Sequence, residues 1–279
     1  MSPLEHFTAA LHPSAEEYAS GRALASEVLP ALRQHFGMLG DSGEDHLVAG
    51  SFGKRTAIRP LPPVDLYILL PGDRQIDPLA AREEVAMALD LGPSALADGW
   101  RVTAPLPGGL VAIAPCLRQG GVFLIPDPYG IGWRVSNPAA EIAAFRVMDQ
   151  VQGGRLHRLL ALVKAWLRHG GVPLATFAAE VLTREYLAEE TAPRDLPGLF
   201  SGFLSWARRR TPAEFSLPGG QGGLFVDPAW HGHGEAAYWR CVLAERLDAA
   251  GEHGPATLEW RRLFGPQVPG PDGDPLALV

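Results

Sequence analysis

Hydrophobic residues in the first half of the chain gather in short runs, whereas in the second half they recur at helical spacing. Four of the short runs have the length and the flanking turn residues of β-strands, and they span residues 64–70, 100–104, 109–114 and 122–125. The second and third runs are separated by Pro105-Leu106-Pro107-Gly108, which predicts a hairpin. We expect these strands to form a mixed sheet.

Helical periodicity predicts most of the remaining elements. It covers residues 22–37 and 78–91 in the first half. The expected inward positions of the second stretch are Leu79, Val85, Ala86 and Leu89. Asn137 followed by Pro138 is a typical helix start, and helices dominate beyond it. The pattern predicts an α+β fold in which a mixed sheet domain at 1–136 packs on a helical domain at 137–279, with a cleft between them.

The predicted helix at 155–169 is amphipathic. Its apolar face consists of Leu156, Leu159, Leu160, Val163 and Leu167. His157, Lys164 and Arg168 lie on or near the other face. This second face is either exposed to solvent or looks into the cleft between the two domains.

Composition and charge restrict the class of protein. The chain has 279 residues, 47% of them hydrophobic, so it can bury a sizeable core. It lacks an apolar run of the roughly 18 residues that a membrane span needs, and its first residues do not resemble a signal peptide. Only two cysteines, Cys116 and Cys241, are present, which suits a reducing compartment. A net charge of −7 argues against an extensive nucleic-acid footprint. We expect a cytoplasmic protein without membrane contact.

Candidate chemistry is concentrated between Gly50 and Leu70. A Gly50-Ser51 turn is followed by Lys54 and Thr56, and then by the predicted strand that carries Asp65. Strand side chains alternate between two faces, so the side chains at 63, 65 and 67 point to the same side. Pro63 stands two residues before Asp65 and has no ligating side chain.

This arrangement resembles the active-site signature of DNA polymerase beta-like nucleotidyltransferases. The segment Gly50-Ser51-Phe52-Gly53-Lys54-Arg55-Thr56-Ala57-Ile58-Arg59-Pro60-Leu61 narrows the resemblance to the bacterial cGAS/DncV-like nucleotidyltransferases (CD-NTases of the SMODS type), distant kin of oligoadenylate synthases. Further similar segments begin at Leu124, Gly132, Ser136, Gly153 and Trp260. The resemblance therefore extends over nearly the whole chain and implies the nucleotidyltransferase fold.

The resemblance also implies site residues. In this family the Gly-Ser turn holds a nucleotide triphosphate, Asp-x-Asp on the following strand binds two magnesium ions, and a neighbouring strand supplies a third carboxylate. Here Pro63 and Ala112 replace two of the three carboxylates, and Asp65 alone remains as a catalytic residue and as a weak or absent metal ligand. We therefore expect catalysis to be lost or severely impaired.

Nucleotide contacts do not all depend on metal. Lys54 and Lys164 are the only lysines among 24 basic residues, and the resemblance places Lys164 against the triphosphate. Tyr67 shares a strand face with Asp65, where it stacks on a base or fills the emptied metal site. The expected nucleotide-binding residues are Gly50, Ser51, Lys54, Thr56, Tyr67 and Lys164. His231-Gly232-His233 lies in a predicted loop at 220–234 without a third metal ligand nearby, so we expect no metal there.

Three functions stay open at this point. The leading interpretation is a pseudoenzyme of a bacterial antiphage (CBASS-like) signalling system, which retains a cleft for a nucleotide or cyclic oligonucleotide, needs no cofactor, and contacts other defence-system proteins. The first alternative is an active enzyme that uses Mg²⁺, Asp65 and an unrecognised carboxylate to make a cyclic di- or trinucleotide. The second is a pure protein-interaction module.

Overall fold

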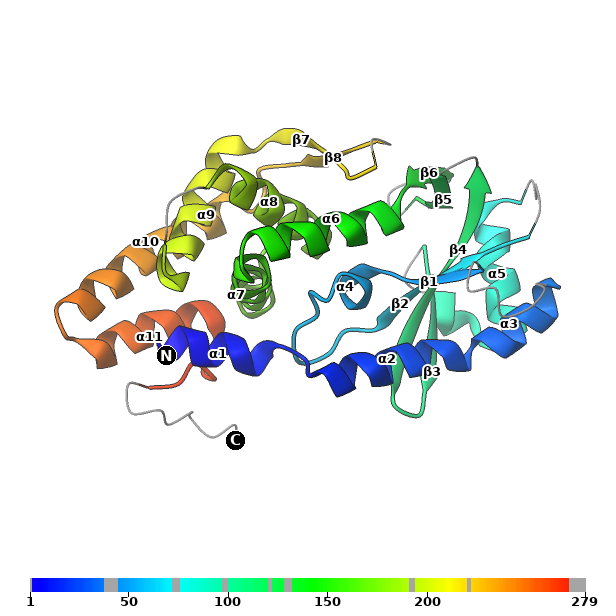
Figure 1. Ribbon diagram of the computed structural model, residues 1–279, viewed down its shortest axis with the longest axis horizontal. Helices are drawn as coiled ribbons and strands as arrows, with labels where there is room; N and C mark the ends of the chain where they lie inside the picture. The colour runs from blue at the N-terminus through cyan, green and yellow to red at the C-terminus, as the bar shows by residue number, and fades with distance from the viewer. Residues whose placement is uncertain are drawn as a thin grey trace.

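The structure, a computed structural model, describes residues 2–37, 45–71, 76–96, 100–119, 122–127, 132–190, 194–219 and 222–270. A sheet with its covering helices forms one part of the molecule and a group of longer helices forms the other (Figure 1). The short helix α4 (Gly50–Gly53) lies where the two parts face each other (Figure 1). The predicted α+β class is confirmed.

The sheet has six strands in the described part of the chain. They are β1 (His46–Val48), β2 (Val64–Leu69), β3 (Val102–Leu106), β4 (Gly109–Gln119), β5 (Val122–Pro126) and β6 (Trp133–Ser136). The order is β1-β2-β4-β5-β6, and β3 pairs with β4 in the predicted hairpin. Strands β2 and β4 run parallel while the other pairs are antiparallel, so the sheet is mixed as predicted.

Helices α2 (Ala15–Glu27), α3 (Leu29–Phe36) and α5 (Pro78–Ala88), with the 3₁₀ helix η1 (Pro93–Leu96), pack on the sheet and form one hydrophobic core with it. The predicted single helix at 22–37 is wrong: α2 ends at Glu27, and Pro30 lies in the first turn of α3. Leu79 was expected to point inward, but it is exposed because it stands in the first turn of α5 and faces away from the core.

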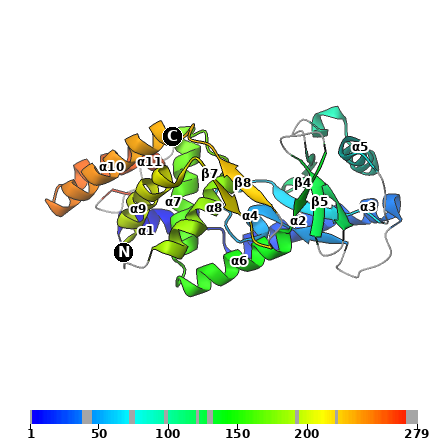
Figure 2. The ribbon, with the colours of Figure 1, turned by 90° about the horizontal axis from the view of Figure 1, so that it is seen from above.

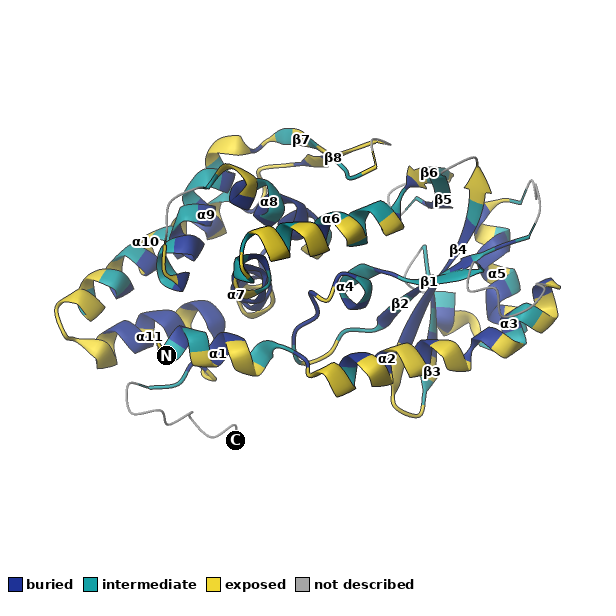
Figure 3. Cartoon of the chain, in the orientation of Figure 1, coloured by how far each residue is buried: buried dark blue, intermediate teal, exposed yellow. Residues whose placement is uncertain are grey.

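The second core belongs to the helices α1 (Pro3–Leu11), α6 (Pro138–Val151), α7 (Arg155–Gly170), α8 (Thr176–Glu189), α9 (Leu196–Arg210), α10 (His231–Ala249) and α11 (His253–Phe264). Asn137 caps α6 as predicted, since its side chain accepts a hydrogen bond from the Ala140 N–H at 3.0 Å. Burial is densest along α7, where every side chain from Leu159 to Leu167 is buried (Figure 3). An apolar and a polar face were expected for α7, but between Leu159 and Leu167 the helix is buried on all sides.

Two features of the helical part depart from expectation. The predicted loop at 220–234 contains strand β8 (Gly223–Val226), which pairs with β7 (Ala213–Ser216), and the start of α10. Helix α1 lies within the predicted sheet domain by sequence, yet it packs on the helical part, where Phe7 meets Phe264 of α11 with ring centroids 5.9 Å apart. Seen from above, α1 lies under the helical end of the elongated molecule (Figure 2). The domain division at residue 136 stays a prediction.

No helix in the described part of the chain is long and apolar enough to cross a bilayer.

Candidate nucleotide-binding cleft

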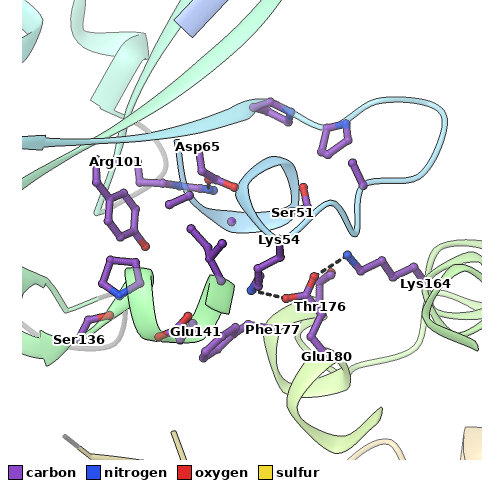
Figure 4. A pocket seen from close by; sticks show the side chains of 18 of the residues that line it. Ser51, Lys54, Asp65, Arg101, Ser136, Glu141, Lys164, Thr176, Phe177 and Glu180 are labelled. Atoms are coloured by element: carbon purple, nitrogen blue, oxygen red, sulfur yellow. Dashed lines mark hydrogen bonds and ion pairs between the residues drawn. The ribbon is translucent and has the colours of Figure 1, made fainter. Parts of the chain in front are cut away.

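A cavity of about 650 Å³ opens between the sheet and the helical part. The α4 turn, β2, β6 and the residues before β3 line it from one side, and helices α6, α7 and α8 line it from the other. Five of the six predicted nucleotide contacts lie on its wall: Gly50, Ser51, Lys54, Tyr67 and Lys164. Asp65 and Pro63 lie there too, so the structure brings the predicted site together (Figure 4).

The Gly50-Ser51 turn packs directly against Asp65. Gly50 has a φ of 53°, and a Cβ at this position would stand 1.9 Å from Oδ2 of Asp65, so both backbone conformation and space require glycine. The turn is closed by the Thr56 N–H, which donates to the Ser51 carbonyl at 2.8 Å. The first N–H groups of a helix have no partner within it, and those of α4 begin at the cavity wall.

Asp65 and Ala112 are direct neighbours across the parallel pair of β2 and β4. Ala112 therefore occupies the place beside Asp65 where the resemblance expects a third carboxylate. Asp65 meets the guanidinium of Arg101, which forms an ion pair with Oδ1 and stacks on Trp100 at 4.5 Å. Burial raises the pKa of the Asp65 carboxyl above its ordinary value, and the charge of Arg101 opposes this shift.

These residues do not fit a site for two magnesium ions. Pro63 brings no side-chain oxygen to the cavity wall, Ala112 brings none to the neighbouring strand, and the one remaining carboxylate already carries a cation from its own chain. Among the described residues, no group of three or more histidine, cysteine, aspartate or glutamate side chains is placed to hold a metal.

Both lysines converge on one buried glutamate, Glu180 of α8 (Figure 4). Lys54 forms an ion pair with Oε2, and Lys164 lies 2.5 Å from Oε1. Thr56 donates from Oγ1 to the same Oε1 at 2.7 Å, and Lys164 also donates to the Thr56 carbonyl at 2.6 Å. Lys54 further lies over the rings of Phe145 and Phe177, at 5.2 and 4.8 Å.

The charges of these groups are strongly coupled. Burial by itself raises the pKa of the Glu180 carboxyl, but the two ammonium groups and their hydrogen bonds outweigh burial and lower it to about 2. Burial lowers the pKa of Lys164 from its ordinary value, and Glu180 counteracts this. One carboxylate between two ammonium groups leaves a net charge of +1.

A third group of polar side chains lies around Tyr67. Burial raises the pKa of the Tyr67 phenol, so it is neutral near pH 7. Burial also raises the pKa of Glu141, which projects from the first turn of α6. Arg134 of β6 lines the same wall, and its Nε is buried without a hydrogen-bond partner in the described part of the chain.

Basic side chains outnumber carboxylates on the cavity wall. Among the described lining residues there are five basic groups, from Lys54, Arg101, Arg134, Lys164 and Arg168. The three carboxylates are those of Asp65, Glu141 and Glu180. A chain of net charge −7 thus holds a cavity of net charge +2, which favours an anionic ligand.

The sequence missed Arg101, Glu141 and Glu180. For Glu180 a signal was present, because it interrupts the apolar run Phe177-Ala178-Ala179 and Val181-Leu182 on an expected helix. Thr56 was expected to contact nucleotide, but it is buried and bonded to Glu180 and Lys164. His231 begins α10, and its Nε2 pairs with Thr211 Oγ1 at 2.6 Å.

The sequence matches no protein-family model and no curated protein. Solved structures do match. The structure of Escherichia coli MS115-1 CdnC with ATP aligns with a TM-score of 0.70 at 16% identity, over 94% of this chain and 96% of CdnC. Escherichia coli DncV bound to 3′-deoxy GTP aligns with a TM-score of 0.72 at 16% identity, over 93% of both chains.

Vibrio cholerae DncV, a cyclic AMP-GMP synthase and prokaryotic cGAS homolog, aligns in complex with the linear intermediate 5′ pppA(3′,5′)pG. Its TM-score is 0.71 at 14% identity, over 94% of both chains. At such identities the matches establish the fold. The chain therefore has the CdnC and DncV nucleotidyltransferase fold over almost its whole length, which confirms the fold expected from the sequence.

Proposed function

We propose that this chain is a catalytically degenerate CD-NTase-like protein whose cleft binds a nucleotide or a cyclic oligonucleotide without a divalent metal. The observation that carries the proposal is the ion pair between Asp65 and Arg101, with Ala112 on the neighbouring strand. Phosphoryl transfer depends on metal ions that position the phosphate and neutralise developing charge. A site that pairs its only expected metal ligand with arginine lacks that chemistry.

The cavity wall supports ligand binding without catalysis. Its net charge of +2, the Ser51 hydroxyl beside the α4 turn, and the unpartnered Nε of Arg134 are all suited to phosphate oxygens. CdnC and DncV have been solved with ATP, GTP analogues and a linear dinucleotide. From the likeness to those proteins we also infer a bacterial antiphage (CBASS-like) context, with other defence-system proteins as partners.

The first test is for catalysis. Purified protein incubated with all four NTPs and magnesium or manganese is expected to form no nucleotide product, because one arginine-paired carboxylate cannot hold two metal ions in line with the reacting phosphate. Chromatography of radiolabelled reactions measures this, with a competent nucleotidyltransferase of the same fold as the positive control. A labelled product that disappears in Asp65→Asn would refute the proposal.

The second test is for binding. Calorimetry with NTPs and cyclic di- and trinucleotides should give an affinity that falls with salt and is the same in magnesium and in EDTA. Arg134→Ala should weaken binding about 10- to 100-fold, the range of a charge-assisted hydrogen bond. Arg146→Ala is the matched control, since Arg146 is exposed on α6 and is not part of the cavity wall.

One observation favours the active-enzyme alternative. Glu141 lines the same cavity as Asp65 and was not foreseen as a carboxylate of the site. If the two together held magnesium, product formation would be lost in Glu141→Gln as well as in Asp65→Asn. An absence of binding by every ligand would instead leave the protein-interaction module.

A further inference from the structure

Glu180 occupies the position in which both lysines of the cleft would otherwise meet a phosphate. It is 2% exposed, and Lys54 and Lys164 are each 6% exposed. Both oxygens of its carboxylate are in use, one with Lys54 and the other with Lys164 and Thr56. A phosphate oxygen that approached either ammonium group would have to displace or share this buried carboxylate.

The cost of such an approach grows with the charge of the ligand. A triphosphate places three or four negative charges within a few ångströms of one another, and Asp65, the carboxylate from which magnesium recruitment is expected, is paired with Arg101 and faces Ala112 on the neighbouring strand. Glu180 lies between the two lysines on the cavity wall, so its carboxylate repels a phosphate oxygen that approaches either ammonium group. The +1 charge of the group formed by Lys54, Glu180 and Lys164 is too small to balance the three or four negative charges of a triphosphate.

Two other basic side chains stay available for ligand. Neither Arg134 nor Arg168 forms an ion pair with a carboxylate in the described part of the chain, and both line the cavity. Arg134 stands on β6 of the sheet, whereas Arg168 stands near the end of α7. The Nη1 group of Arg168 donates a hydrogen bond to the Arg59 carbonyl at 2.8 Å, and this bond fixes the Arg168 guanidinium at the cavity wall. Single cations on two different elements match singly charged phosphodiesters better than a contiguous triphosphate.

We propose that Glu180 determines which ligand class the cleft accepts: it blocks the lysine pair against triphosphates and leaves a site for a cyclic oligonucleotide, whose phosphodiesters each carry one charge. This inference rests on the proposed binding function and names the ligand class of the same cleft. Lys54 and Lys164 then serve as partners of Glu180, and Arg134 and Arg168 contact the ligand.

The test compares two ligand classes on two proteins. Wild type and Glu180→Gln are titrated calorimetrically, in EDTA, with cyclic AMP-GMP, cyclic di-AMP, ATP and inorganic tripolyphosphate. Wild type is expected to bind at least one cyclic dinucleotide at least about tenfold more tightly than ATP or tripolyphosphate. Glu180→Gln should bind ATP and tripolyphosphate about 10- to 100-fold more tightly than wild type, which is the range of one freed charge-assisted contact. Its affinity for cyclic dinucleotides should change little.

Two further variants distinguish a change in ligand preference from a loss of folded protein. Glu180→Gln combined with Lys164→Met removes one positive charge with the negative one, yet still frees Lys54, so the same shift toward triphosphates is expected. Glu259→Gln is the matched control. Glu259 is another buried glutamate that pairs with two basic side chains, Arg240 and Arg262, but it is not on the cavity wall.

The results separate this inference from the function on which it rests. Binding of a cyclic dinucleotide to wild type, without any gain for ATP in either Glu180 variant, would overturn the role of Glu180 and leave metal-free binding intact. Equal wild-type affinity for ATP and the cyclic dinucleotides would likewise overturn the role of Glu180 and leave metal-free binding intact. Failure of all four ligands to bind wild type and both variants would overturn the proposed function and this inference together.

Discussion

At the scale of single residues, charged side chains of the cleft are paired with charged side chains of the same chain. The guanidinium of Arg101 pairs with Asp65, and the carboxylate of Glu180 pairs with both lysines and leaves that group with a charge of +1. Under the proposed function, Arg101 stands where the family resemblance expects magnesium, and Glu180 stands where it expects phosphate. A guanidinium suits a partly buried carboxylate because it stays protonated at all physiological pH values and is weakly hydrated.

The ion pair of Arg101 with Asp65 leads to a prediction about placing the two carboxylates that the family resemblance expects at positions 63 and 112. The double variant Pro63→Asp, Ala112→Asp returns two metal ligands, but Arg101 still pairs with Asp65 and is expected to keep activity near background. Adding Arg101→Ala should raise product formation from labelled NTPs and magnesium further, by about tenfold or more if one charge-assisted contact competes with the metal.

The triple variant has its own control. Adding Asp65→Asn to it should remove whatever activity appears, since a metal site acts as a unit. Equal activity of the double and triple variants would show that Arg101 does not compete with magnesium.

The sequence located half of this site. The structure places Asp65 and Ala112 opposite each other on neighbouring strands, as the family resemblance implies, because strand pairing fixes their positions. Arg101 and Glu180 were not found, because their partners are remote: Arg101 is 36 residues from Asp65, and Glu180 is 124 residues from Thr56. The first pairing is set by the strand order of the sheet and the second by how the two parts of the molecule pack, and local periodicity encodes neither.

At the scale of elements, the α4 turn is the part of the site with the tightest steric requirement. It follows β1 directly and presses Gly50 against Asp65 of β2, while Gly53 lies so close to the Val48 carbonyl that a Cβ would stand 2.4 Å from it. Sequence predicted this turn and the strand at 64–70 well, because Gly-Ser and a long apolar run are strong local signals.

Weaker elements escaped prediction. Strand β6 and the β7–β8 pair have only four residues each, too few to establish a period of two. The break between α2 and α3 falls inside a continuous apolar stripe, so only Pro30 indicated it. Leu79 was assigned inward by period alone, although position in the first turn of α5 turned it to solvent.

The turn permits a stability prediction with a close control. Gly50→Ala combines a φ of 53° with a Cβ 1.9 Å from Asp65 Oδ2, whereas Gly171→Ala has a φ of 55° and no atom within 4 Å of the new Cβ. Gly171→Ala should therefore lower the free energy of unfolding by about 1 kcal/mol, the cost of the backbone conformation alone. Gly50→Ala should cost about 2 kcal/mol more, because the turn or Asp65 must shift.

Urea denaturation followed by circular dichroism measures both variants. Equal losses would mean that the α4 turn relaxes without strain. In that case the contact between Gly50 and Asp65 would not hold the turn in place.

At the scale of the whole molecule, buried polar contacts cross the cleft, beside the packing of Ile58 from the segment before β2 into the helical core. The sheet part contributes Lys54 and Thr56, and the helical part contributes Lys164 and Glu180. His157 of α7 adds a contact of 3.3 Å from Nε2 to the Lys54 carbonyl. The two hydrophobic cores remain separate clusters on either side. The buried charges are therefore part of what holds the two parts together.

This arrangement predicts how stability responds to acid. The Glu180 pKa falls from its ordinary value of 4.5 to about 2 in the folded protein. A lowered pKa means that the carboxylate stabilises the folded state above pH 4.5 and that this contribution disappears as the pH falls toward 2. From these two values it is on the order of 3 kcal/mol at pH 7 and about 1 kcal/mol at pH 3. Comparing wild type with Glu180→Gln reports this contribution together with the change at Lys164, which loses the counter-charge that opposes burial.

Urea denaturation at pH 7, 5, 4 and 3 should therefore give a stability difference between wild type and Glu180→Gln that shrinks as the pH falls. Glu141→Gln supplies a control of opposite sign. Burial raises the pKa of Glu141, so its ionisation destabilises the folded state, and the variant should gain stability over wild type as the pH rises. A difference for Glu180→Gln that stays constant from pH 7 to pH 3 would mean that the charge of Glu180 does not help to hold the two parts together.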